Sequence, residues 1–125
     1  MKPSKNTIED CHELFLSLRD FGDIWGGKWK IQIILYLSVN KDKTIYFTEM
    51  RRDLPGISSK MLSKELKDLE INRLVSRIVH PTRPVKVEYL ITAHGESFAP
   101  VAETMILWGL QHRRLILGKS PSGSN

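Results

Sequence analysis

A chain of 125 residues and 14.4 kDa has the length of one ordinary domain, which is long enough to bury a core and too short for two full enzyme domains. Hydrophobic residues make up 41% of it and charged residues 26%, which excludes the disordered, collagen-like and disulfide-scaffold classes. The net charge is +5, yet residues 1–23 hold three Lys and Arg against five Asp and Glu, so the rest of the chain carries +7. This basic body predicts an anionic partner, but charge alone does not separate DNA, RNA, a membrane surface and solubility.

The cysteine count and the apolar runs indicate where the protein works. A single cysteine cannot form an internal disulfide or a cysteine-rich zinc site, and no apolar leader follows Met1. The longest apolar runs, such as residues 33–37, are far shorter than a membrane span. We therefore expect a cytoplasmic protein with no membrane partner.

Two helices are predicted in the first 40 residues. Apolar residues recur at steps of three and four between Thr7 and Phe21, which predicts an amphipathic helix ended by Gly22. Residues 26–39 begin with a glycine pair and are apolar on nearly all sides, which predicts a central buried helix that stops at Asn40. The apolar face of the first helix holds Ile8, Cys11, Leu14, Phe15 and Leu18.

The middle of the chain has the outline of a helix-turn-helix. Residues 44–47 predict a very short strand, and residues 48–54 a short helix. Pro55-Gly56 marks a turn, and Ser58 is placed to cap a helix over residues 59–70. Two helices joined by so short a turn are typical of a helix-turn-helix.

A hairpin and a long helix are predicted to follow. Residues 74–80 and 86–91 have strand composition and flank a proline-bracketed basic tip, so they predict a wing beside the helix-turn-helix. The last helix is expected over residues 93–117, with Thr92 as its cap and a kink at Pro100.

The predicted fold class is therefore α+β: a winged helix-turn-helix domain over residues 1–117, followed by a flexible tail over residues 118–125. The last helix carries two adjacent apolar stripes, more than so small a domain can cover, so we expect the N- and C-terminal helices to form a homodimer interface. The alternative is that Phe98 and Trp108 belong to the core of the monomer. The expected interface residues are Leu14, Leu18, Phe98, Val101, Met105 and Trp108.

The helix over residues 59–70 has the pattern of a recognition helix. Its leucines fall on one face, and short hydroxyls and lysines fall on the opposite face, where they suit a major groove. The alternative is a solvated lysine face, but the basic hairpin that follows favours DNA. The residues expected to contact double-stranded DNA are Ser58, Ser59, Lys60, Ser63, Lys64 and Lys67, with Arg51 as a phosphate contact and Arg83 and Lys86 as backbone or minor-groove contacts. The alternative for these three cations is ordinary exposed charge that keeps the protein soluble.

Several motifs follow one another along the chain: Gly26-Gly27-Lys28-Trp29, the runs 47–58, 60–62 and 66–70, residues 87–92 with Gly95, and Trp108-Gly109 with His112. In this order they resemble the HxlR-type (MarR-like) winged helix-turn-helix transcriptional regulators of bacteria. The resemblance implies a homodimer that binds an inverted-repeat operator, with dimer contacts from the terminal helices. The family usually has a glycine where this chain has Arg73, so we expect Asn72 to take the left-handed turn there.

Cys11 is the candidate for a redox sensor. Some members of the family that the chain resembles use a cysteine near the N-terminus to sense oxidants, but typically closer to the glycine pair than the 15 positions between Cys11 and Gly26. The acidic neighbours of Cys11 disfavour a reactive thiolate. We therefore expect a small buried residue on the apolar face of the first helix, with the redox sensor as the alternative.

No set of residues predicts an enzyme, a metal site or a cofactor. The four histidines show no metal-ligand spacing with cysteine or carboxylates, and the glycine pair lacks the pattern of a phosphate-binding loop. A winged helix that makes protein contacts without binding DNA is the alternative function. No small-molecule effector, operator sequence or direction of regulation is predicted.

Overall fold

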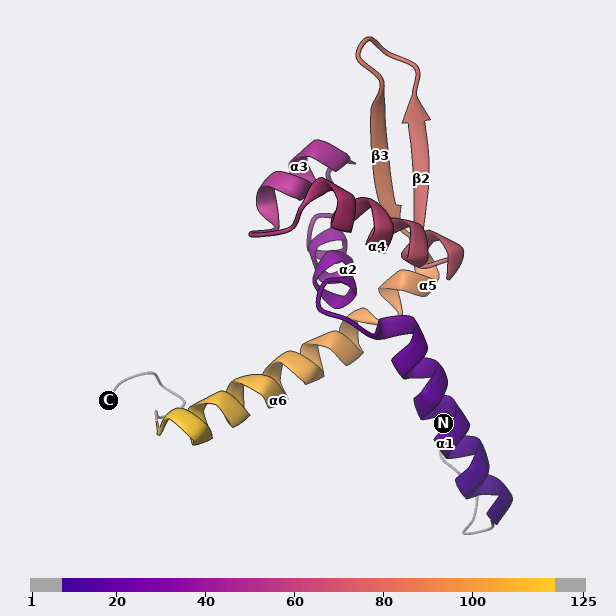
Figure 1. Cartoon of the computed structure of the whole chain (residues 1–125), viewed down its shortest axis with the longest axis vertical. Coiled ribbons are helices and arrows are strands. Elements are labelled where there is room, and N and C mark those ends of the chain that lie inside the picture. Colours follow the sequence, from indigo (N-terminus) through magenta and orange to yellow (C-terminus); the bar gives the residue numbers. More distant parts are fainter. Residues whose placement is uncertain (1–7, 119–125) are drawn as a thin grey trace.

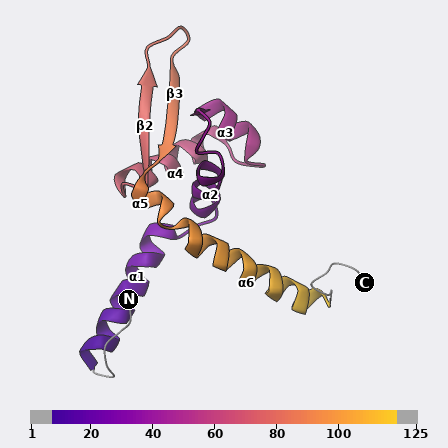
Figure 2. The ribbon, with the colours of Figure 1, turned by 180° about the vertical axis from the view of Figure 1, so that it is seen from behind.

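Six helices and three strands make up the part of the chain that the computed structural model describes, residues 8–118. A hairpin projects from one side of the molecule, and helices α1 and α6 extend from the opposite side (Figure 1). The view from behind shows the same arrangement (Figure 2). In chain order the elements are α1 (Ile8–Trp25), α2 (Lys30–Val39), β1 (Ile45–Tyr46), α3 (Phe47–Asp53), α4 (Ser59–Ile71), β2 (Val75–His80), β3 (Lys86–Ile91), α5 (Ala93–Glu96) and α6 (Ala99–Leu117).

The strands form one antiparallel sheet in the order β1-β3-β2. β2 pairs with β3 along its whole length, from Val75 to His80, and β1 pairs with the other edge of β3. The strands predicted over 74–80 and 86–91 are confirmed to within one residue. Since α3 and α4 precede this hairpin and residues 54–58 join them, the predicted α+β winged helix-turn-helix is confirmed.

The core lies where α2 packs against α4, α5, α6 and β3. This central position explains why the sequence of α2 is apolar on nearly all sides. Each fully buried apolar side chain contributes about 1.5–3 kcal/mol, so the cluster fixes the orientation of α4 on the domain. The largest fully buried side chains are those of Ile33, Ile34, Leu37, Met50, Leu62, Leu66, Leu69 and Val75.

The turn between α3 and α4 has the chemistry that the sequence predicted. Gly56 has a φ of +85°, a left-handed conformation that favours glycine. The Ser58 hydroxyl oxygen accepts a hydrogen bond from the Met61 backbone N–H at 3.1 Å, so Ser58 is confirmed as the N-cap of α4. The start of α4 is thereby fixed next to the turn.

The boundary between α1 and α2 differs from the prediction. α1 continues through Gly22 to Trp25, and α2 begins at Lys30, four residues later than expected. A glycine inside a helix costs roughly 0.5–1 kcal/mol, but here Trp25 is buried and its ring stacks on that of Phe98 at a centroid distance of 3.9 Å. This packing extends α1, and the chain turns instead at Gly27, which has a φ of +100°.

The end of α4 also differs from the prediction. Asn72 has a φ of −85°, and Arg73 takes the left-handed conformation with a φ of +62°. The Leu74 N–H donates to the Leu69 carbonyl and the Arg73 N–H to the Glu70 carbonyl, both at 2.9 Å. These two hydrogen bonds form a Schellman motif, which places Arg73 where a glycine is usual.

The helix predicted over residues 93–117 is two helices, α5 and α6, rather than one kinked helix. Pro100 lies in the first turn of α6, where its missing N–H is not needed, so this proline marks a helix start. Thr92 is confirmed as the cap of α5, since its hydroxyl oxygen accepts from the Gly95 N–H at 2.9 Å.

α6 ends as predicted at Leu117, and Gly118 follows it with a φ of +72°. The Gly118 N–H donates to the Arg114 carbonyl, which closes the last turn. The remainder of the predicted tail, residues 119–125, lies outside the described residues.

Candidate nucleic-acid interface

The outer face of α4 consists of short hydroxyl and lysine side chains. The leucines of the opposite face are buried in the core, which turns the polar face toward solvent. Because the leucine face is buried, only the polar face of α4 is available to a partner. The major groove of DNA is wide enough to admit such a helix. The exposed residues of this face are Ser59, Lys60, Ser63, Lys64 and Lys67, and the cap Ser58 is exposed beside them.

The lysines of this face differ in their partners. The Nζ of Lys64 lies 3.5 Å from Asp68 Oδ2 and 3.8 Å from Glu65 Oε2, so its charge is partly shared within the helix. Within residues 8–118, neither Lys60 nor Lys67 has a carboxylate oxygen within 4.0 Å. These two lysines therefore offer full charges to an anionic partner.

A buried ion pair anchors α4 to α2, and the sequence did not predict it. Lys30 Nζ donates to Glu65 Oε1 at 2.6 Å and lies 3.4 Å from Asp68 Oδ2. Burial lowers the pKa of Lys30, but the hydrogen bonds and charges of Glu65 and Asp68 raise it more, so the pKa lies above its usual value. Lys30 thus stays protonated and holds the middle of α4 on the domain.

A second polar contact joins α2 to the end of α3. The Tyr36 hydroxyl donates to Asp53 Oδ2 at 2.6 Å, while Arg52 Nε donates to Asp53 Oδ1 at 3.0 Å. Burial and the Asp53 carboxylate raise the pKa of Tyr36 to about 12. Arg51 and Arg52 are both exposed, but only Arg52 has a carboxylate oxygen within 4.0 Å among residues 8–118.

The hairpin of β2 and β3 with its tip, residues 75–91, forms the wing, which carries the other two predicted contacts. Arg83 is exposed at the tip. Lys86 is exposed as well, and its Nζ lies 5.2 Å from the centre of the Tyr46 ring, which keeps this cation at the base of the tip. His80 Nε2 and Glu88 Oε1 lie 2.9 Å apart across the same strands and tie the two sides of the wing together.

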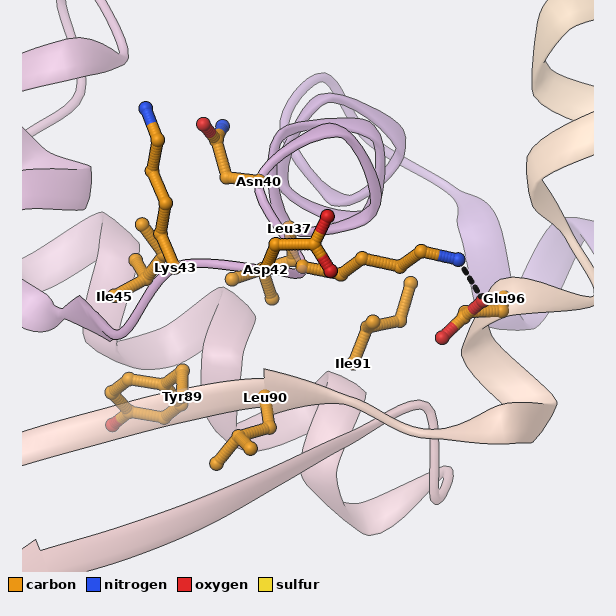
Figure 3. A pocket seen from close by; sticks show the side chains of 10 residues that line it. Leu37, Asn40, Asp42, Lys43, Ile45, Tyr89, Leu90, Ile91 and Glu96 are labelled. Carbon is orange, nitrogen blue, oxygen red and sulfur yellow. Dashed lines mark hydrogen bonds and ion pairs between the residues drawn. The ribbon is translucent and has the colours of Figure 1, made fainter.

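A separate cavity of about 320 Å³ lies between the turn after α2 and the strand β3. Leu37, Ile45 and Tyr89 contribute apolar atoms to it, and the Lys41 Nζ pairs with Glu96 Oε1 at 3.2 Å along one side (Figure 3). None of the residues predicted to contact DNA lines this cavity. It shares Tyr89, Leu90 and Ile91 with the base of the wing but contains no residue of α4.

The two terminal helices expose much apolar surface. Of the 21 large hydrophobic side chains exposed in the described part of the chain, 14 lie on α1 and α6. Five of the six residues predicted for the dimer interface belong to this exposed set: Leu14, Leu18, Val101, Met105 and Trp108.

Phe98 and Cys11 are placed differently from the sequence expectation. Phe98 is only 7% exposed, because it packs on Trp25 and Phe21 inside the protomer. Cys11 is exposed rather than buried, because α1 leaves the domain and its outer turns touch no neighbouring element within the protomer. Phe98 therefore packs the start of α6 against α1 within the protomer and is not part of the exposed apolar surface.

This geometry is that of a winged helix-turn-helix regulator, and the comparisons with known proteins agree. Residues 24–115 match the HxlR-like helix-turn-helix family. The HTH-type transcriptional regulator YtcD of Bacillus subtilis is 34% identical over 96 residues, which cover 77% of this chain and 74% of YtcD. The regulator BH0655 of Halalkalibacterium halodurans is 40% identical over 88 residues, 70% of this chain and 76% of BH0655. The redox regulator HypR in its reduced form superimposes with a TM-score of 0.71 at 32% identity, over 82% of this chain and 98% of HypR.

The chain belongs to the HxlR-like helix-turn-helix family. It is a transcriptional regulator of the helix-turn-helix type and not an enzyme. Within residues 8–118, no helix combines the length and the apolar character needed to cross a bilayer.

Proposed function

We propose that this regulator binds an inverted-repeat operator in double-stranded DNA as a homodimer. α4 enters the major groove of each half-site, and the tip of the wing contacts the adjacent backbone or minor groove. A two-fold protein meets two half-sites on one side of the duplex, spaced by about one helical turn of 10–10.5 base pairs or a multiple of it.

The exposed basic face of α4 is the observation that carries this proposal. Lysines reach phosphates and guanine edges, and the serines between them let the helix backbone approach the duplex closely. A winged helix that makes only protein contacts is expected to present an acidic or apolar face here. The Ser and Lys side chains of α4 and the exposed Arg83 on the wing favour DNA instead.

Lys60 gives the first test, because it is exposed near the start of α4 and has no carboxylate partner within residues 8–118. Lys60→Ala is expected to weaken operator binding about tenfold, since a lost base or phosphate contact costs about 1–3 kcal/mol. The free energy of unfolding is expected to change by less than about 0.5 kcal/mol, because the side chain is exposed. Fluorescence anisotropy with a duplex selected from bound genomic fragments measures the affinity.

Lys43→Ala is the matched control, since Lys43 is an exposed lysine on the turn after α2 and outside the proposed interface. Its affinity is expected to equal that of the wild type. Wild-type affinity should also fall by orders of magnitude between about 50 and 200 mM salt if six or more phosphates are neutralised. Equal affinities of the wild type and Lys60→Ala would refute the role of this face.

The apolar surface on α1 and α6 supports the homodimer. The two helices leave the domain on the side opposite the wing, so a partner that covers them leaves both DNA-facing surfaces free (Figures 1 and 2). An apolar surface of this extent marks an interface in soluble proteins. Cys11 belongs to the same face of α1 as Leu18, so the proposed dimer also covers its thiol.

Trp108 gives the second test, because its side chain is 65% exposed at the centre of α6. Trp108→Glu places a charge in the proposed interface, so sedimentation is expected to show a monomer of 14.4 kDa where the wild type shows twice that mass. Operator affinity is expected to fall about 100-fold, since the second half-site is no longer bound by a linked subunit.

The control for this test is Val39→Glu, which introduces the same charge at an exposed apolar residue outside α1 and α6. This variant is expected to stay dimeric. A wild-type chain that sediments as a monomer at micromolar concentration both alone and with the duplex would contradict the homodimer.

A further inference from the structure

A hollow of about 360 Å³ lies between α4 and the wing. Its lining combines residues from the proposed recognition helix with residues from the sheet. Two of the five lining residues are cationic and one is acidic, so the hollow carries a net positive charge. The lining residues are Ser63, Lys67 and Glu70 from α4, Arg77 from β2 and Tyr89 from β3.

The register of the wing places Arg77 on the side of the sheet that faces α4. Arg77 lies directly opposite Tyr89 in the pairing of β2 and β3, and Tyr89 is buried. Directly paired residues project to the same face, as do residues two apart along a strand, so Arg77 shares this face with the buried Val75. Because α4 packs against β2, the Arg77 side chain emerges between the helix and the wing.

The charges of Arg77 and Lys67 are unused within the protomer. Arg77 is exposed, and in the stretch that the structure describes neither cation has a carboxylate oxygen within 4.0 Å or donates a side-chain hydrogen bond. The Ser63 hydroxyl is exposed one turn of α4 before Lys67 and adds a third donor. Three donors that converge from two elements on one concave site suit a tetrahedral oxyanion.

We propose that this hollow binds one backbone phosphate of the operator, with Arg77 as its principal ligand. The inference rests on the proposed function and adds a contact that connects α4 to the wing. With α4 in the major groove, the strand that borders the groove must pass between the helix and the wing. Arg77 meets that strand with the planar fork that pairs with two phosphate oxygens, while Lys67 and Ser63 approach the same phosphate from the helix.

A phosphate contact does not distinguish one base from another, so its role is to set the register of the protein on the duplex. It ties one phosphate to both elements and thereby fixes how deeply α4 enters the groove. The Glu70 carboxylate lies at the same hollow and opposes the phosphate charge, so it lowers the affinity of the site. Arg77 and Glu70 are therefore expected to have opposite effects on binding.

The test compares Arg77→Ala with Lys43→Ala, which removes an exposed cation on the turn after α2, outside α1, α4, α6 and the hollow. Arg77→Ala is expected to raise the Kd about tenfold for specific and random duplexes alike. It should also reduce the slope of log K against log salt by about 0.9, the effect of one lost phosphate contact. Lys43→Ala should change neither quantity, and thermal melting verifies that both variants fold.

A second measurement locates the phosphate, and two further variants test the charges around it. Replacing single phosphates of the duplex by neutral methylphosphonates should weaken wild-type binding at one position per half-site, and that position should weaken Arg77→Ala much less, since only Lys67 and Ser63 still contact the phosphate there. Glu70→Gln should tighten binding at low salt, whereas Arg77→Lys should keep the salt slope and lose part of the affinity.

The outcomes separate this inference from the function on which it rests. If the wild type binds the duplex and Lys60→Ala weakens binding, but Arg77→Ala keeps both affinity and salt slope, the phosphate site is refuted and the proposed function stands. If the wild type binds no duplex selected from genomic fragments and shows no salt-dependent binding to random DNA, the proposed function fails with it. A methylphosphonate position that affects the wild type and Arg77→Ala equally also refutes the site.

Discussion

Lys30→Met is expected to lower the free energy of unfolding by about 3–5 kcal/mol, the usual cost of removing one partner of a buried ion pair. Lys30 Nζ lies 2.6 Å from Glu65 Oε1, and the two side chains are 10% and 8% exposed. Without the ammonium, the Glu65 carboxylate stays buried with no opposite charge beside it. Denaturant unfolding followed by circular dichroism measures the loss.

Lys41→Met is the matched control, because Lys41 pairs with Glu96 at 3.2 Å at the surface, where the side chains are 54% and 40% exposed. An exposed pair contributes about 0–1 kcal/mol, so this variant should be nearly as stable as the wild type. The double variant Lys30→Met/Glu65→Leu should recover most of the lost stability, since an apolar pair often replaces a buried ion pair without cost. Equal losses in Lys30→Met and Lys41→Met would contradict the importance of burial.

The pKa of Lys30 defines the pH range of this effect. The pKa is raised above 10.5 in the folded chain, so the contribution of Lys30 to stability is complete below the unfolded pKa and disappears as the pH rises through the folded one. The difference between the wild type and Lys30→Met should therefore be constant around neutral pH. It should shrink once the pH exceeds about 10.5.

The sequence predicted α4 in detail, because one helical period places both the leucines that face the core and the serines and lysines that face solvent. Leu62, Leu66 and Leu69 are spaced three or four positions apart and are all buried, which leaves the serines and lysines between them exposed. The cap at Ser58 follows from local chemistry as well. Short-range patterns were therefore sufficient for this helix and for the strands of the wing.

Contacts between distant residues were not predictable in this way. Lys30 and Glu65 are 35 positions apart, and each looks like an ordinary exposed charge within its own helix. Arg77 likewise lies in a strand, and the alternation of apolar and polar residues along that strand does not indicate that α4 packs beside it. Their roles became visible through the packing of α2 and β2 against α4.

The terminal helices show that an apolar pattern does not decide whether a residue is buried within the protomer or exposed. Phe98 and Trp108 have the same character in the sequence, yet Phe98 packs on Trp25 in the core and Trp108 is exposed. Cys11 lies on an apolar face in both the sequence and the structure, but α1 leaves the domain and exposes it. Periodicity identifies an apolar face, and tertiary packing decides which element covers it.

Gly95→Ala is the second substitution with a large expected effect, because the added methyl group has no room. An added Cβ would overlap the Leu74 carbonyl oxygen and lie 2.7 Å from Ile91 Cγ1. That carbonyl cannot withdraw without cost, since it accepts hydrogen bonds from both the backbone N–H and the hydroxyl of Thr92 at 3.1 Å. α5 must therefore move away from the turn between α4 and β2.

This movement strains the core and breaks the Thr92 cap of α5, so we expect a loss of about 3 kcal/mol or more. The thermal midpoint should fall by about 10 °C or more. Gly22→Ala is the control, because an added Cβ there meets no atom within 4 Å and replaces a glycine inside α1, where alanine is favoured by up to about 1 kcal/mol. A midpoint of Gly95→Ala within about 2–3 °C of the wild type would show that α5 can move away from the Leu74 carbonyl at little cost.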